Sequence, residues 1–262
     1  MSRSYLNIMR LEQLAATVTP TELAILQTLR QVRIASGAQL ERTHFARATP
    51  RRRRQVLQSM AERGLLTRLD RVVAPRSGSA GYLYGLDIAG QRLLVQGEGT
   101  RVRRPITPGA PFVAHALAVT ELATRLREAE RRGHIEVLDL QTEPDCWRRH
   151  PGPGGASVVC KPDGYVRLGA GAFEDSYFWE LDLATESPST LDRKLDAYRR
   201  YWTSGIEQSR RGVFPRVLWM VPDLRRHQVV TDAIGRQPAE AWQLHLCTLF
   251  EDAVGLMVGG AS

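Results

Sequence analysis

Three acidic residues and one lysine in the second half of the chain have the types and spacing that a metal site beside a phosphate requires. Asp163 follows a proline, Glu180 and Asp182 alternate along a hydrophobic run, and Lys194 lies in the next segment. Carboxylate oxygens are the ligands that Mg²⁺ and Mn²⁺ prefer, and such an ion orients an attacking water and neutralises charge on phosphate. We therefore expect Asp163, Glu180 and Asp182 as metal ligands. Asp163, Glu180 and Lys194 are the expected catalytic residues. Mg²⁺ or Mn²⁺ is expected only if the site is catalytic; otherwise the acids are surface charges of a hairpin.

The elements that must position these residues are two strands and a helix. Hydrophobic runs over residues 158–168 and 177–183 predict a hairpin, and alternation places Glu180 and Asp182 on one face of its second strand. The turn between the runs would bring Asp163 beside that strand. A helix over residues 187–202, with Ser187 as N-cap, would leave Lys194 at the edge of its buried face.

The other segments of residues 112–262 alternate between helical and strand patterns. Helices are expected at 112–132 and 225–236, and strands at 135–140, 216–221 and 242–249. The segment 143–155, rich in proline, glycine and arginine, is expected to be irregular. This order predicts an α/β domain in which helices flank a mixed sheet. It resembles the restriction-endonuclease-like core of the PD-(D/E)XK nucleases, whose third strand carries an acid-x-lysine triplet. Here that triplet ends in Asp182, and Lys194 is the expected substitute for the lysine.

The first part of the chain differs in charge. Residues 1–104 hold 18 arginines against seven acidic residues, a net charge of +11, whereas the remainder carries −3. Helices are expected from Pro20, with Thr19 as N-cap, over residues 38–45, and from Pro50 to Arg63, with Thr49 as N-cap and Gly64 ending the helix. Two hydrophobic runs around a polar loop follow. Three helices and a hairpin are the order of a winged helix-turn-helix, which we expect as a DNA-binding domain over residues 1–104.

The helix from Pro50 separates apolar from polar side chains. Val56, Leu57 and Met60 share one face, while Arg53 lies nearer the core and is expected to contact phosphate or a neighbouring carboxylate. Arginine and glutamine suit bidentate contacts with guanine and adenine. The expected DNA-binding residues, which include one in the hairpin loop, are Arg51, Arg52, Arg54, Gln55, Gln58 and Arg76. The alternative is a solvated basic face in a protein-binding winged helix.

Composition narrows the remaining function classes. No apolar run approaches the roughly 20 residues that span a bilayer, so we expect a cytoplasmic protein without a membrane partner. Cys146, Cys160 and Cys247 are widely separated, which favours neither disulfides nor a zinc site. The expected partner is double-stranded DNA, with a second copy of the chain and replication or conjugation proteins as further candidates.

Taken in order, several short motifs resemble the plasmid replication-relaxation proteins. The residues that carry this resemblance are Thr19 to Leu26, Arg63 to Leu66, Tyr84 to Leu86, Gly90, His115 to Val119, Glu143, Pro162 to Gly164, Glu180 to Asp182, Lys194 and Tyr198. The resemblance implies a winged helix joined to a nuclease-like domain, encoded on plasmids or integrative elements and associated with replication or mobilisation.

Two hypotheses follow for the whole chain. In the first, the protein binds a DNA site and nicks or cuts it with a divalent metal. In the second, it is a non-catalytic transcriptional regulator or relaxosome accessory protein with a degenerate nuclease-like domain. A third reading, a relaxase with Tyr198 or Tyr201 as nucleophile, is disfavoured because the sequence has no histidine triad for the metal of such enzymes.

Overall fold

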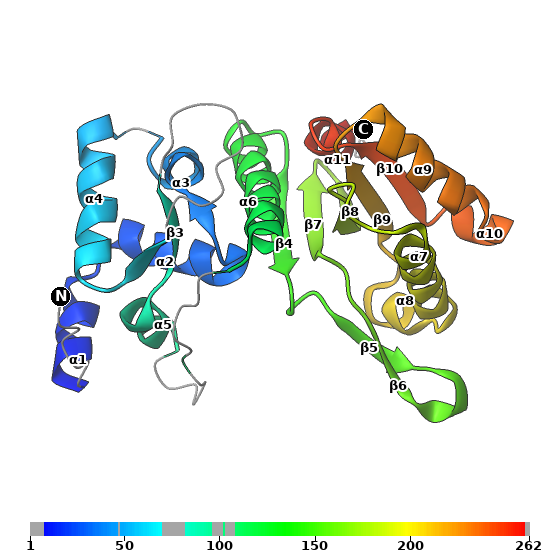
Figure 1. The fold of residues 1–262 in the computed structure, drawn as a ribbon, viewed down its shortest axis with the longest axis horizontal. Helices are drawn as coiled ribbons and strands as arrows, with labels where there is room; N and C mark the ends of the chain where they lie inside the picture. Colours follow the sequence, from blue (N-terminus) through cyan, green and yellow to red (C-terminus); the bar gives the residue numbers. More distant parts are fainter. Residues whose placement is uncertain (1–7, 47, 70–81, 96–101, 103–107, 260–262) are drawn as a thin grey trace. The chain divides into compact units, whose positions relative to one another are not determined.

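The computed structural model describes residues 8–46, 48–69, 82–95, 102 and 108–259. The chain forms two compact units, Met1–Thr124 and Arg125–Ser262 (Figure 1). Among the described residues, no helix is long and apolar enough to cross a membrane.

The first unit combines short helices with a small antiparallel sheet in the order β1-β3-β2. Its elements are α1 (Ile8–Thr17), α2 (Pro20–Val32), β1 (Ala35–Ser36), α3 (Gly37–His44), α4 (Pro50–Glu62), β2 (Leu66–Leu69), β3 (Leu83–Leu86), α5 (Ile88–Leu94) and the part of α6 (Ala110–Arg131) up to Thr124.

Local capping explains where the helices of this unit begin. Thr19 and Glu22 form a capping box at α2, and the Thr49 hydroxyl accepts from the Arg52 amide at the start of α4. Both predicted N-caps are therefore confirmed. Gly64, with φ +71°, ends α4 as predicted. The helix α3 also begins with a capping box, formed by Ser36 and Gln39, which the sequence reading missed.

The core of the first unit forms where the apolar faces of these helices meet β2 and β3. The buried residues of this core include Ile25, Leu26, Leu29, Leu40, Leu57, Met60, Leu65, Leu66 and Tyr84. The first half of α6 also contacts this unit: Thr120 Oγ1 donates to the Ile34 carbonyl, and Gln39 Nε2 donates to the Leu117 carbonyl. The expected domain limits, 1–104 and 112–262, stay a prediction.

The second unit is built on a five-stranded sheet in the order β10-β9-β8-β7-β4. β4, β7 and β8 pair antiparallel, while β8, β9 and β10 pair parallel, so the expected mixed sheet flanked by helices is confirmed. Its strands are β4 (Glu136–Thr142), β5 (Arg148–Pro151), β6 (Ser157–Cys160), β7 (Gly164–Ala170), β8 (Phe173–Leu181), β9 (Arg216–Val221) and β10 (His245–Leu249). Its helices after α6 are η1 (Pro153–Gly155), α7 (Pro188–Thr203), α8 (Ile206–Arg211), α9 (Leu224–Gly235), α10 (Ala239–Trp242) and α11 (Ala253–Gly259).

The structure has two strands where the sequence predicted one. The run 158–168 divides into β6 and β7, and β6 pairs with β5 in a separate two-stranded sheet (Figure 1). Arg148, the first residue of β5, has its guanidinium buried over the rings of Tyr165 and Phe178, so this end of the β5–β6 pair is held at the five-stranded sheet. The segment 143–155, expected to be irregular, therefore contains a strand. Asp163 lies in the break between β6 and β7.

Candidate functional site

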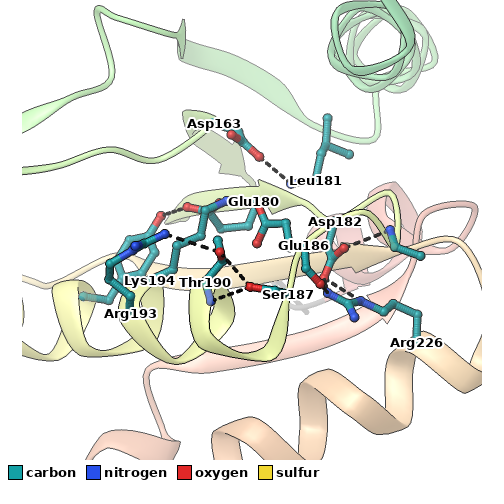
Figure 2. A network of polar contacts seen from close by, with 12 residues as sticks. Asp163, Glu180, Leu181, Asp182, Glu186, Ser187, Thr190, Arg193, Lys194 and Arg226 are labelled. Atoms are coloured by element: carbon teal, nitrogen blue, oxygen red, sulfur yellow. Dashed lines mark hydrogen bonds and ion pairs between the residues drawn. The ribbon is translucent and has the colours of Figure 1, made fainter. Parts of the chain in front are cut away.

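The expected catalytic residues come together at the end of β8, the central strand of the five. Lys194 Nζ, on α7, donates to Glu180 Oε2 at 2.6 Å and to Glu186 Oε1 at 2.6 Å (Figure 2). Asp163, immediately before β7, accepts from the Leu181 amide at 2.7 Å through Oδ2. We call Asp163, Glu180, Asp182, Glu186 and Lys194 the carboxylate centre.

Glycine at position 164 allows this approach. Gly164 lies opposite Trp179 in the β7–β8 register, and a Cβ at Gly164 would stand 1.9 Å from the indole ring. Because the ring covers the glycine, the strands stay close and the Asp163 carboxylate reaches the backbone of β8. The motif Pro162-Asp163-Gly164 thus has a packing reason as well as a chemical one.

Glu180 is buried, and both of its oxygens have donors. Its side chain is 1% exposed, and Oε1 accepts from the Tyr198 hydroxyl at 2.5 Å. Burial raises the pKa of Glu180 to about 8, the charge of Asp163 adds to this shift, and Lys194 and Tyr198 oppose it. Burial likewise raises the pKa of Asp163 to about 6, against the lowering effect of Lys194.

Lys194 supplies the positive charge of this centre. Burial lowers the pKa of its ammonium, but the charges of Glu180 and Asp163 outweigh burial, so the pKa is raised. The ammonium is therefore protonated at neutral pH. At 26% exposure, the Lys194 side chain also lies at the edge of the buried face of α7, as the helical periodicity predicted.

Asp182 is directed to a different helix. Its Oδ2 accepts from Arg226 Nε of α9 at 2.7 Å and its Oδ1 from the Ala184 amide at 2.9 Å (Figure 2). Arg226 Nη2 also donates to the Glu186 carbonyl at 3.0 Å. Sequence reasoning missed Arg226, because no local pattern links a residue on α9 to one at the end of β8.

These contacts decide whether the residues fit a divalent metal. Mg²⁺ requires oxygen ligands at about 2.0–2.1 Å in near-octahedral geometry. The oxygens of Glu180 and Asp182 already accept from ammonium, guanidinium, hydroxyl and amide groups. Among the residues that the structure describes, no group of three or more His, Cys, Asp or Glu is arranged to hold a metal ion. The carboxylate centre as arranged therefore does not fit Mg²⁺ or Mn²⁺, and we derive no catalytic step through a metal.

The two tyrosines considered as nucleophiles are also buried. Tyr198 and Tyr201 are at most 1% exposed, and their hydroxyls donate to Glu180 and Glu207. Burial and these carboxylates raise the pKa values of both phenols, so the phenolates are disfavoured. Neither hydroxyl is placed to attack a phosphodiester from outside the fold.

The polar face of α4 is exposed, as its angular pattern predicted. Leu57 and Met60 point into the core of the first unit, and Arg53 Nη1 contacts Glu41 Oε2 at 3.1 Å. Its exposed side chains include those of Arg51, Arg52, Arg54, Gln55 and Gln58, which we call the α4 basic face. Glu62 is exposed as well and accepts from Gln58 Nε2 at 2.8 Å. Arg51 and Arg52 form no ion pair with another described residue. Arg76, the remaining expected DNA contact, lies outside the described residues.

Comparison with known proteins places the chain in a family. A family model described as replication-relaxation matches residues 26–217, a segment that contains both α4 and the carboxylate centre. No curated protein and no solved structure matches the chain. Because the match covers well over half of the 262 residues, the chain belongs to the replication-relaxation family.

Proposed function

We propose that this protein binds double-stranded DNA at a specific site and acts in replication or mobilisation of a plasmid or other mobile element. Family membership supports the role in replication. The α4 basic face is the observation that carries the DNA-binding part, because it presents arginine and glutamine side chains outward from a helix anchored by a buried apolar face.

The surroundings of α4 support a winged helix-turn-helix reading. α2, α3 and α4 are followed by β2 and β3, which pair antiparallel, and β1 completes the small sheet. In a winged helix, the helix equivalent to α4 enters the major groove. Arg51 and Arg52 lie in the first turn of α4, where the helix dipole and unpaired backbone amides favour phosphate.

A binding assay with matched variants tests the proposal. Fluorescence anisotropy with fragments of a plasmid or element that encodes a family member would locate the site. The triple variant Arg51→Ala, Arg54→Ala, Gln55→Ala is expected to abolish site-specific binding, and each lost phosphate contact should reduce the salt slope by about 0.9.

The control removes the same side-chain types elsewhere. Arg132, Arg225 and Gln228 are exposed in the second unit, so their triple alanine variant has the same charge change. It should bind like the unaltered protein. Equal affinity of the α4 triple variant and this control, with both folded by circular dichroism, would refute the assignment of α4.

A second candidate function, DNA cleavage, is favoured by the convergence of Asp163, Glu180 and Lys194. The element order of the second unit also resembles the PD-(D/E)XK nucleases, which supports this reading. Such cleavage requires a metal that the carboxylate centre as arranged does not fit. We therefore favour binding without cleavage, with a second copy of the chain and replication or conjugation proteins as proposed partners. Metal-dependent nicking of supercoiled plasmid, abolished by Asp163→Ala, would establish the enzyme instead.

A further inference from the structure

The carboxylate centre contains cations supplied by the chain itself. The Lys194 ammonium bridges Glu180 and Glu186 at 2.6 Å each, and the Arg226 guanidinium contacts Asp182 at 2.6 Å. We propose that these two groups take the place of a divalent metal, so that the centre is a metal-independent clamp that fastens α7 and α9 to the end of β8.

The contacts of Lys194 exclude a metal ion from the position between Glu180 and Glu186. An ion shared by Glu180 and Glu186 would need the position between their oxygens that the ammonium occupies. A metal at that position would meet a like charge unless Lys194 swung away, and swinging away would forfeit two charged hydrogen bonds.

Asp182, the third of the expected metal ligands, is already paired with Arg226. Asp182 is 1% exposed and Arg226 is 11% exposed on their side chains, so this pair is held inside the fold. Removing the guanidinium from Asp182 would leave a buried charge without a partner, which is strongly unfavourable. Asp182 therefore cannot turn to a metal near Glu180 at low cost.

The same contacts explain what the centre does in the second unit. Lys194 and Tyr198 join α7 to Glu180 of β8, while Arg226 joins α9 to Asp182 and to the carbonyl of Glu186 (Figure 2). α7 and α9 also contact each other. Both helices are thus held at the end of β8 that carries Glu180 and Asp182, two of the expected metal ligands.

Metal binding by the full chain, measured without DNA, tests the proposal separately from the proposed function. Titration of Mn²⁺, followed by the electron paramagnetic resonance signal of the free ion, should reveal no saturable site in the unaltered protein. Its melting temperature should be the same in Mg²⁺, Mn²⁺ or EDTA. Saturable Mn²⁺ binding that Glu180→Gln abolishes would overturn the proposal.

A variant of Lys194 tests whether its ammonium group is what excludes the metal ion. Lys194→Ala vacates the position between Glu180 and Glu186, and it is expected to acquire Mn²⁺ binding that the double variant Lys194→Ala, Glu180→Gln lacks. A folded Lys194→Ala protein that still ignores Mn²⁺ would show that the ammonium is not what excludes the metal. If Lys194→Ala does not fold, the titration of the unaltered protein decides the proposal.

Discussion

Replacing Lys194 by methionine keeps the length of the side chain but removes its charge and both hydrogen bonds. The ammonium contacts Glu180, which is 1% exposed, and Glu186, which is 20% exposed. A hydrogen bond to a charged group contributes about 1.5–3 kcal/mol, and removing one partner of a buried ion pair costs about 3–5 kcal/mol. Because Lys194 is itself 26% exposed, we take the lower end. We therefore expect a loss of about 3 kcal/mol in the free energy of unfolding near pH 9, above the pKa of Glu180.

The pH dependence of this loss has a defined sign. The raised pKa values of Asp163, about 6, and Glu180, about 8, mean that each carboxyl destabilises the fold as pH rises from its unfolded pKa through its folded pKa. Lys194 limits this destabilisation. The gap between Lys194→Met and the unaltered protein should therefore be smallest near pH 5 and should widen above about pH 6, by at most about 1.4 kcal/mol per pH unit for each group.

Urea unfolding monitored by tryptophan fluorescence at several pH values provides the measurement, and the second lysine provides the control. Lys161 is exposed and lies 4.6 Å from the Trp147 ring, so Lys161→Met should change stability by no more than about 0.5 kcal/mol. The reasoning is refuted if both variants cost the same, or if the gap narrows as pH rises.

Three further predictions concern other contacts. Arg226→Met should lower the free energy of unfolding in urea by about 3 kcal/mol. Adding Asp182→Asn should recover part of that loss, because the unpaired charge is removed. If the losses of the two single variants simply add in the double variant, Arg226 and Asp182 are not coupled. Burial lowers the pKa of His245 to about 4, so stability should fall as pH drops from about 6.5 to about 4, by up to about 3.4 kcal/mol. The His245→Phe variant should lack this pH dependence. If its stability changed with pH in parallel with that of the unaltered protein, the assignment to His245 would be wrong. A Cβ at Gly90 would stand 2.2 Å from a backbone oxygen, whereas Gly235 has nothing within 4 Å. Gly90→Ala should therefore lower the melting temperature while Gly235→Ala does not, and equal shifts would contradict the close packing of α5.

Features that depend on neighbouring residues were predicted well. The N-caps Thr19, Thr49 and Ser187 precede the helices that they were expected to begin, because each hydroxyl needs only an amide two or three residues ahead. The exposed and buried faces of α4 followed from helical periodicity for the same reason.

Features that depend on distant residues were predicted in part. The expected strand over residues 158–168 was wrong in its continuity, since pairing between β5 and β6 divides it. The short helices α8, α10 and α11 were not expected. Such short helices gain most of their stability from packing against other elements, and that packing leaves little local signal.

The carboxylate centre shows both what the sequence alone predicted and what depended on the tertiary structure. The sequence by itself determined the family, the helix starts, and the acids and lysine that meet at the end of β8. Only the tertiary structure decided their partners: Lys194 between Glu180 and Glu186, and Arg226 on Asp182. The reason is physical, because a carboxylate can pair with a metal ion, an ammonium group or a guanidinium group. The residue type alone does not decide among these partners. Which of these it meets depends on strand order and helix packing over more than 40 residues of chain, as the 44-residue separation of Asp182 and Arg226 illustrates.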